Sequence, residues 1–323
     1  MKNIIEVQDL TKNYGNFAAV KGISFSVHEG EIFGFLGPNG AGKTTTINML
    51  TGLARITSGS STLLGYDLAL ETKKAQQVMG IVPDESNLYD ELNGFENLCF
   101  AASLYGMERG KREARARRLL EQFGLADAEA KPFRAYSKGM KRKLTIAAGI
   151  IHEPKILFLD EPTTGIDVAS ARQIRNLILD LNASGTTVFL TTHYIEEAER
   201  LCHRIAFIVG GKIVKIGTVD ELMSQAQDET IVQFKLDDGR AAGLDQALQA
   251  RFPEFRAEFL SDDTLRIHSP IPISLMPFIQ FFDEKGINVY EAKVIRPSLE
   301  DVFVKVTGIE IDKMSKEKEH RRR

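Results

Sequence analysis

The feature that most constrains this chain is a glycine-rich turn set between a short apolar run and an amphipathic segment. The apolar run at 31–36 predicts a buried strand, and the residues from 43 to about 50 predict a helix. The turn between them fits the pattern GxxxxGK[ST], with Lys43 and Thr44 at its end. Glycines let backbone N–H groups approach phosphate oxygens closely, and a helix N-terminus adds partial positive charge. The sequence therefore predicts a phosphate-binding loop in a strand–turn–helix unit.

Each part of this loop has an expected role toward a nucleoside triphosphate and its magnesium ion. The Lys43 ammonium is expected to reach the β- and γ-phosphates, and the Thr44 hydroxyl is expected to bind Mg²⁺. The residues expected to bind the nucleotide are Gly37, Pro38, Asn39, Gly40, Ala41, Gly42, Lys43, Thr44 and Thr45.

A second motif joins two carboxylates to a buried strand. The apolar residues at 156–159 predict the strand, and Asp160, Glu161 and Pro162 follow it directly. Packing cannot explain two acidic residues there, because burying charge is costly unless a cation compensates it. We expect Asp160 to orient Mg²⁺ and Glu161 to polarise the attacking water, since phosphoryl transfer depends on positioning and charge neutralisation.

Composition excludes several classes of protein. The formal net charge is −3, whereas nucleic-acid-binding domains carry a basic surplus, so nucleic acid is not an expected partner. Cys99 and Cys202 form no CxxC motif and are expected to be reduced thiols of a cytoplasmic protein. The N-terminus lacks a signal-peptide apolar stretch, and no apolar run approaches the ~18 residues that a spanning helix needs. We therefore expect a chain that does not itself cross a membrane.

The pattern along the chain predicts two domains, in keeping with a length of 323 residues. Alternating strands and amphipathic helices over 1–222 predict an α/β domain with a mostly parallel sheet. Residues 93–150 read as a helical insert within it. Residues 229–308 follow the order βαββαβ, which predicts a small ferredoxin-like α+β appendix, with the first helix over 241–252. Residues 309–323 form a charged tail, for which disorder is expected.

A third segment decides the kind of nucleotide-binding protein. Tyr136-Ser137-Lys138-Gly139-Met140-Lys141 precedes the acidic strand and resembles the signature motif of ABC ATPases, usually written LSGGQ. Together the three motifs give a P-loop NTPase resembling the ABC ATPase domain, with an antiparallel β part beside the parallel sheet. The resemblance implies that Ser137 and Gly139 complete the ATP site of a second copy, so that a homodimer sandwiches two nucleotides. Lys138, Met140 and Lys141 depart from the common motif.

The same resemblance assigns further residues. His193, after the strand at 187–190, matches the switch histidine near the γ-phosphate, and Asp167 ends a segment like the family's D-loop. Tyr14 stands where the family places an aromatic ring against adenine, although a core aromatic on a strand is nearly as good an interpretation. Asp84 stands where the family has the glutamine of its Q-loop. It is expected either to bind Mg²⁺ or to make a coupling contact with the membrane subunits.

The C-terminal run Pro297-Ser298-Leu299-Glu300-Asp301-Val302-Phe303 resembles the ending of ATPase subunits from bacterial drug- and antibiotic-resistance exporters. The resemblance implies a cytoplasmic ATPase, peripheral on the inner face of the cell membrane. It would drive export of a drug, antibiotic, lipid or ion through separate transmembrane permease subunits. The alternative is a soluble ABC ATPase of translation or DNA maintenance, but the chain has one cassette and no sustained heptads. A non-enzymatic ATP sensor would be expected to lack Lys43 or Glu161, and both are present.

Overall fold

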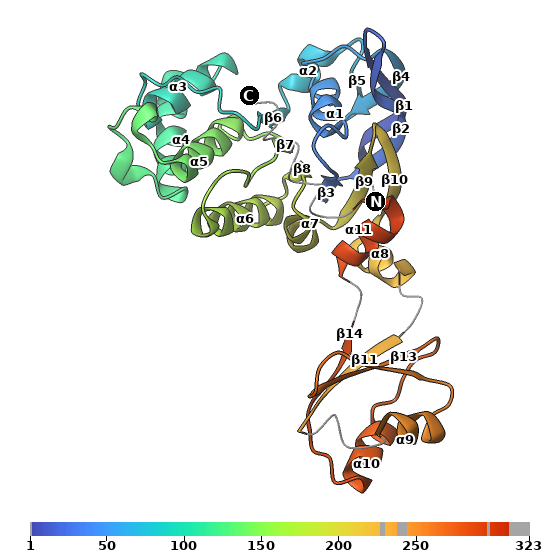
Figure 1. Ribbon diagram of the computed structural model, residues 1–323. Helices are drawn as coiled ribbons and strands as arrows, with labels where there is room; N and C mark the ends of the chain where they lie inside the picture. Colours follow the sequence, from blue (N-terminus) through green and yellow to red (C-terminus); the bar gives the residue numbers. More distant parts are fainter. Residues whose placement is uncertain (1, 227–229, 238–243, 296–297, 310–323) are drawn as a thin grey trace. The chain divides into compact units, whose positions relative to one another are not determined.

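The computed structural model describes residues 2–226, 230–237, 244–295 and 298–309, and it falls into two units (Figure 1). Unit 1 comprises Met1–Val219 and the residues from Val306 onward, and unit 2 comprises Asp220–Lys305. The division thus lies at the start of helix α8 (Val219–Ala226), close to the boundary expected at residue 222. Of the expected charged tail, all but residue 309 lies outside the described residues. Within the described residues, no helix is both long and apolar enough to cross a membrane.

A six-stranded sheet forms the centre of unit 1, in the order β10-β9-β3-β8-β7-β6. Its strands are β3 (Ile32–Leu36), β6 (Met79–Val82), β7 (Ile156–Asp160), β8 (Thr187–Thr192), β9 (Arg204–Val209) and β10 (Lys212–Thr218). All neighbours pair in parallel except β10, which returns antiparallel to β9. Every residue of β3 and β7 is buried, as expected for continuous apolar strands in a parallel sheet. The carboxyl ends of β3, β7 and β8 therefore meet at one edge of the sheet.

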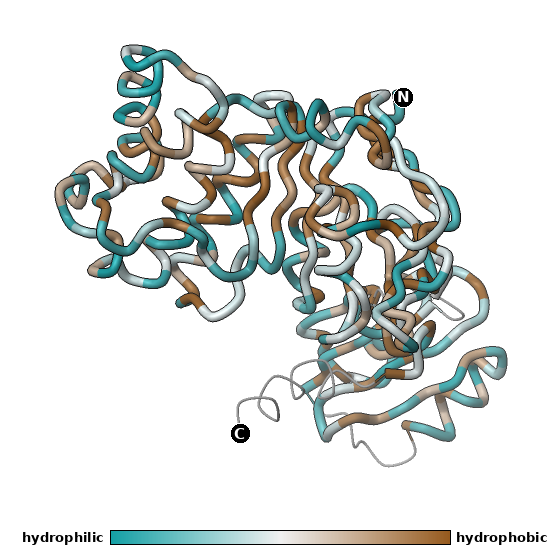
Figure 2. The backbone as a smooth tube through the Cα atoms, turned by 90° about the horizontal axis from the view of Figure 1, so that it is seen from above, coloured by the Kyte–Doolittle hydropathy of each residue, from teal (hydrophilic) through white to brown (hydrophobic). Residues whose placement is uncertain are grey.

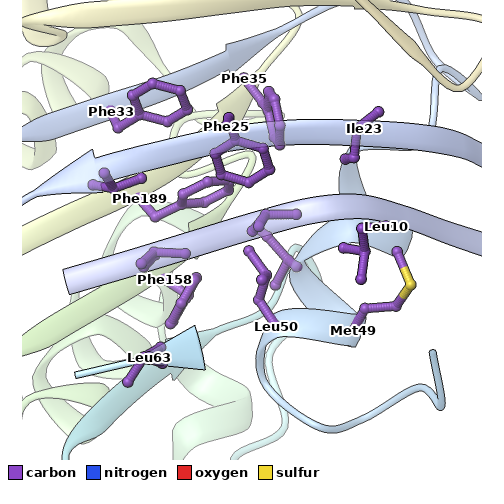
Figure 3. Close-up of a cluster of buried hydrophobic side chains, with 14 of the residues drawn as sticks. Leu10, Ile23, Phe25, Phe33, Phe35, Met49, Leu50, Leu63, Phe158 and Phe189 are labelled. Carbon is purple, nitrogen blue, oxygen red and sulfur yellow. The ribbon is translucent and has the colours of Figure 1, made fainter. Parts of the chain in front are cut away.

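An antiparallel sheet, in the order β2-β1-β4-β5, packs against this centre through a shared apolar core. Its strands are β1 (Asn3–Tyr14), β2 (Phe17–His28), β4 (Ser58–Leu63) and β5 (Tyr66–Asp67). Figure 3 shows Phe25 of β2 among Phe33, Phe35 and Phe189 from the central strands. The rings of Phe35 and Phe189 meet edge to face with centroids 5.1 Å apart, a favourable arrangement for aromatic pairs. This core fixes the strand from which the phosphate loop leaves.

The helices of unit 1 form two groups. Those that flank the sheets are α1 (Lys43–Leu50), α2 (Thr72–Gln76), α6 (Val168–Ala183) and α7 (Ile195–Leu201). The expected helical insert is confirmed as α3 (Gly94–Leu104), α4 (Arg109–Gln122) and α5 (Lys138–Gly149), with short 3₁₀ turns at Ala126–Ala128 and Phe133–Ala135. Figure 1 shows this insert beyond β6, away from the antiparallel sheet. Figure 2 shows hydrophobic residues gathered along the interior strands and hydrophilic ones on the outer turns of the helices.

Unit 2 is built on its own four-stranded antiparallel sheet, in the order β12-β13-β11-β14. Its elements are β11 (Thr230–Leu236), α9 (Leu244–Arg251), β12 (Arg256–Phe259), β13 (Thr264–Ser269), α10 (Met276–Glu284), β14 (Val289–Ile295) and α11 (Leu299–Thr307), whose end passes into unit 1. The element order and strand order are those of the expected ferredoxin-like arrangement. Phe234, Phe278 and Phe282 lie in its apolar core. The expected starts of the first strand at 229 and of the first helix at 241 lie outside the described residues.

Candidate active site

The turn between β3 and α1 has a backbone that only glycine accommodates at several positions. Gly40 and Gly42 have φ of 79° and 103°, in the left-handed region where side chains are strained. A Cβ at Gly37 would lie 2.1 Å from the carbonyl oxygen of Ile208, and one at Gly42 would lie 2.7 Å from that of Ala19. The loop is therefore a tight backbone cradle at the N-terminus of α1.

Lys43 is the first residue of α1 and is buried at the centre of this cradle. Its Nζ donates hydrogen bonds to the carbonyl oxygens of Gly37 and Pro38, at 2.7 and 3.1 Å. The same Nζ lies 3.2 Å from Oε1 of Glu161, and both side chains are about 5% exposed. The sequence assigned Lys43 to phosphate, and the structure adds a buried ion pair with the expected catalytic carboxylate.

Glu161 lies at the point where β7 ends, with an unusual φ of 50° for a residue with a side chain. Its Oε2 accepts hydrogen bonds from Nδ1 of His193 at 2.7 Å and from Oγ1 of Thr164 at 3.0 Å. Burial would raise the pKa of the carboxyl, but the His193 bond and the charge of Lys43 outweigh it and lower this pKa to about 2. The group is thus a fully ionised carboxylate at neutral pH. The backbone strain at such a position is typical of functional sites.

Asp160 is the last residue of β7, and its environment differs from that of Glu161. Its Oδ1 accepts a hydrogen bond from the Thr191 hydroxyl of β8. Burial raises its pKa, hydrogen bonding by Thr191 and Thr44 opposes this, and the negative charges of Glu161 and Asp84 raise it further. A nearby cation would stabilise the ionised carboxylate against burial and against these negative charges. Within the described residues, however, no group of three or more His, Cys, Asp or Glu side chains is arranged to hold a metal by itself.

The residues of the signature segment lie at the start of α5. Ser137 caps this helix, with its hydroxyl accepting from the Met140 amide at 3.2 Å, as expected for a serine N-cap. A Cβ at Gly139 would lie 2.3 Å from Oγ of Ser170, which belongs to α6. Asp167 caps α6 by accepting from the Ser170 amide at 2.8 Å. Ser137 is exposed, and its hydroxyl bonds to an amide of its own helix rather than to the phosphate loop.

Two further residues singled out from the sequence lie at the surface. Tyr14 ends β1 with 51% of its side chain exposed, and Nζ of Lys12 lies 4.7 Å from its ring centroid. The interpretation of Tyr14 as a core aromatic is therefore wrong. Asp84 is exposed just after β6, and its charge acts on both Asp160 and Arg142.

Arg142 of α5 is a buried residue that the sequence reasoning missed. Its guanidinium donates to the carbonyl oxygens of Asp160 at 2.6 Å and Pro162 at 2.9 Å. It also donates to the carbonyl oxygens of Pro83 and, at 3.2 Å, of Asp84. One side chain thus joins α5, which begins with the signature segment, to the segment after β6 and to the turn after β7. The sequence pattern could have predicted its burial, because Arg142 lies three residues before Thr145 and four before Ile146. Both of these residues are buried, and this spacing puts all three on the same face of the helix.

Glu197 of α7 is a second missed residue. It is 2% exposed, and its Oε1 accepts from the Thr163 hydroxyl at 2.7 Å. Burial raises its pKa, which the hydrogen bonds with Thr192 and Thr163 partly offset. The contact links the helix after His193 to the turn after Glu161. Its position four residues after His193, on a short helix facing the core, is the sequence signal that could have found it.

The first comparison concerns sequence. The family described as "ABC transporter" matches residues 20–164. The linearmycin resistance ATP-binding protein LnrL of Bacillus subtilis is 38% identical, over 94% of this chain and 98% of its own length. A fluoroquinolones export ATP-binding protein of Mycobacterium tuberculosis is 40% identical, over 94% of this chain and 93% of its own. Such coverage includes unit 2 as well as unit 1.

The second comparison concerns solved structures. The structure titled as an ATP binding subunit of an ABC transporter is 32% identical with a TM-score of 0.63, covering 69% of this chain and 92% of that one. A dimeric post-hydrolysis structure of the ATP-binding cassette MJ0796, bound to ADP and Pi, is 25% identical with a TM-score of 0.62. It covers 66% of this chain and 98% of its own. The α/β fold expected from the sequence is that of these cassettes.

Proposed function

The chain belongs to the ATP-binding proteins of ABC transporters, and we propose that it drives export through separate transmembrane subunits. As an ATPase of this family it binds and hydrolyses ATP. The observation that carries the proposal is the junction of Lys43, Glu161 and His193 beside the glycine cradle, at the edge where β3, β7 and β8 end.

The residues of the cradle fit a nucleotide with Mg²⁺. Glycine at 37 and 42 lets the loop pack tightly against the backbone oxygens of Ile208 and Ala19, and successive amides of a loop of this kind can form a nest for phosphate oxygens. Lys43 supplies the positive charge for the β- and γ-phosphates. The Thr44 hydroxyl and the Asp160 carboxylate are oxygen ligands that suit Mg²⁺, which also takes phosphate oxygens and water. When bound, Mg²⁺–ATP supplies the reacting γ-phosphoryl group and the charge that offsets these anions.

Glu161 is the proposed general base. The Lys43 ammonium has three N–H donors, and its two carbonyl partners and Glu161 take up all three. Binding a phosphate therefore draws the ammonium away from the carboxylate. Losing that cation raises the pKa of Glu161 and makes it a better acceptor for a proton from water. His193 and Thr164 keep hold of Oε2, which leaves Oε1 for the water. The same histidine is proposed to reach the γ-phosphate, as the family resemblance implies.

We propose that Ser137 and Gly139 act in trans, on the nucleotide held by a second copy. The exposed hydroxyl at the start of α5 is available to another chain, and the solved dimer of a similar cassette supports this arrangement. In this proposal Tyr14 stacks on adenine, in keeping with its exposed ring. Asp84 makes the coupling contact with a membrane subunit, because Thr44 and Asp160 already supply the protein ligands for Mg²⁺.

The proposals for a permease partner and for export as the direction of transport are based on the relatives. LnrL and the fluoroquinolone protein are named for resistance and export, and similarity to them extends through unit 2. We therefore propose a drug or antibiotic as cargo and a peripheral position on the cytoplasmic face of the membrane. We also propose that residues 1–222 form an ATPase domain and that residues 229–308 form an accessory domain.

Transport in inverted membrane vesicles tests this proposal. Vesicles carrying the chain together with its transmembrane permease subunits should accumulate a drug only when ATP is added. Lys43→Ala and Glu161→Gln should abolish that uptake, whereas Glu199→Gln, the same change on the exposed face of α7, should leave it intact. Uptake by the Lys43→Ala vesicles equal to that of the wild type would refute the proposed motor.

A further inference from the structure

The backbone on both sides of Glu161 is held by one buried side chain. Arg142 is 7% exposed, and its guanidinium donates to the carbonyl oxygen of Asp160 at 2.6 Å and to that of Pro162 at 2.9 Å. These carbonyls belong to the residues directly before and after Glu161. The φ of Glu161 is 50°, a strained conformation that persists only where its surroundings enforce it. The two bonds from Arg142 help to enforce it.

The remaining nitrogen of the same guanidinium contacts the segment after β6. Its Nη1 donates to the carbonyl oxygen of Pro83 and, at 3.2 Å, to that of Asp84. Strands β6 and β7 are parallel neighbours, and the last pair in their register is Val82 with Leu159. Pro83 has no N–H with which to continue that ladder. Arg142 therefore connects the two chain segments where the hydrogen bonding between their strands ends.

The chemistry of arginine suits this double contact. A guanidinium is planar, and its donors form a rigid fork. Nε and Nη2 bond the turn after β7 while Nη1 bonds the segment after β6, so a shift of one segment is passed to the other without a flexible link. Burial lowers the pKa of the Arg142 guanidinium, and the negative charges of Asp84, Asp160, Glu197 and Glu161 oppose this effect. The cation is thus held among the carboxylates of the site.

We propose that Arg142 is a positioning residue that transmits movement of the backbone at 83–84 to the general base Glu161. This inference rests on the proposed function, in which Asp84 contacts a membrane subunit. When that contact moves the segment after β6, the guanidinium shifts the carbonyls on both sides of Glu161. The carboxylate then moves relative to the attacking water. The permease thereby sets the rate of hydrolysis through a side chain buried between the two sites.

Arg142→Lys tests the hold on Glu161 while the positive charge is retained. Lysine presents its donors from a single nitrogen on a flexible stem, so it cannot replace the fork. In the purified chain without permease, we expect kcat to fall by up to about 10²-fold, as misplaced catalytic groups can cause. The KM for ATP and the number of ATP sites found by calorimetry should stay unchanged, whereas a merely structural role would lower the number of sites.

Arg118→Lys is the matched control, because it makes the same change at an exposed position on α4. It should leave kcat, KM and the number of ATP sites at their wild-type values. A wild-type kcat in Arg142→Lys would overturn the proposal. A fall in kcat that only matches a loss of ATP sites would overturn it as well.

The complex with the permease subunits, reconstituted in proteoliposomes, tests the transmission step. The permease should stimulate hydrolysis by the wild type and by Arg118→Lys, but much less by Arg142→Lys. Asp84→Asn should reduce stimulation in the wild-type background and change nothing further in the Arg142→Lys background, because both residues act on one path. Full stimulation of Arg142→Lys, or independent losses from the two substitutions, would overturn the proposal.

Hydrogen exchange on the wild-type complex provides a test that needs no variant to fold. Adding permease should change amide protection at 84–88 and at 161–165 together, and a change confined to 84–88 would overturn the role of Arg142. Failure of the proposed function gives a different result. A wild type that the permease does not stimulate would overturn that function and this inference with it, whereas stimulation retained by Arg142→Lys overturns this inference alone.

Discussion

The buried pair of Lys43 and Glu161 leads to a stability prediction for the nucleotide-free protein. Replacing Lys43 by Met keeps the length of the side chain but leaves the carboxylate buried without its cation. Against the effect of burial, the hydrogen bond from His193 and the charge of Lys43 together lower the pKa of Glu161 from 4.5 to about 2, which at 1.36 kcal/mol for each pKa unit is about 3 kcal/mol of preference for the ionised form. Breaking one side of such a pair typically costs about 3 kcal/mol or more.

For a unit of this size, about 3 kcal/mol lowers the melting temperature by roughly 6–12 °C. Differential scanning calorimetry without nucleotide should show this fall for Lys43→Met. Lys43→Met/Glu161→Gln should recover most of it, because the double variant buries no unpaired charge. Additive effects of the two single substitutions would refute the reasoning, because they would show that the two side chains are not coupled.

Three further predictions concern neighbouring residues. Arg142→Met should destabilise the protein by about 2–4 kcal/mol in urea unfolding, because it leaves several carbonyl oxygens without their donor; an unchanged midpoint would contradict this. Ser137→Ala removes the helix cap and should cost about 1 kcal/mol of stability in the same assay. It should also lower the ATPase activity of the dimer by more than this loss of stability explains. The carboxyl of Glu161 stabilises the fold above its unfolded pKa of 4.5, and this contribution is lost as pH falls toward 2. Wild type should therefore lose stability relative to Glu161→Gln over that range, and parallel pH curves would contradict the low pKa.

The sequence predicted the parts of the site that depend on local pattern. A glycine-rich turn between an apolar strand and a helix specifies a phosphate loop, and β3 and α1 lie where expected. Likewise Asp160 and Glu161 follow a strand whose burial is evident from its composition. These features are readable because strand, turn and helix signals are local, and because carboxyl ends of parallel strands share one sheet edge.

Contacts between distant segments could not be predicted in the same way. The bonds of Arg142 reach carbonyl oxygens after β6 and β7, and the bond of Glu197 reaches the turn after Glu161. Which carbonyl a buried side chain reaches depends on how α5 and α7 pack on the sheet, and no short pattern specifies this. The exposure of Tyr14 is a similar case, because it follows from β1 ending beyond the sheet core.

Comparing ATP binding with ATP hydrolysis in Glu161→Gln tests whether Glu161 is the general base. The amide keeps the size of the side chain and its place beside Lys43, but it is a poor base for water. We expect near wild-type ATP affinity by isothermal titration calorimetry, and steady-state hydrolysis reduced by about 10²–10⁴-fold, the usual contribution of a general base. Glu199→Gln should change neither quantity. Hydrolysis by purified Glu161→Gln at the wild-type rate would contradict the assignment of Glu161 as the general base, and with it the proposed active site.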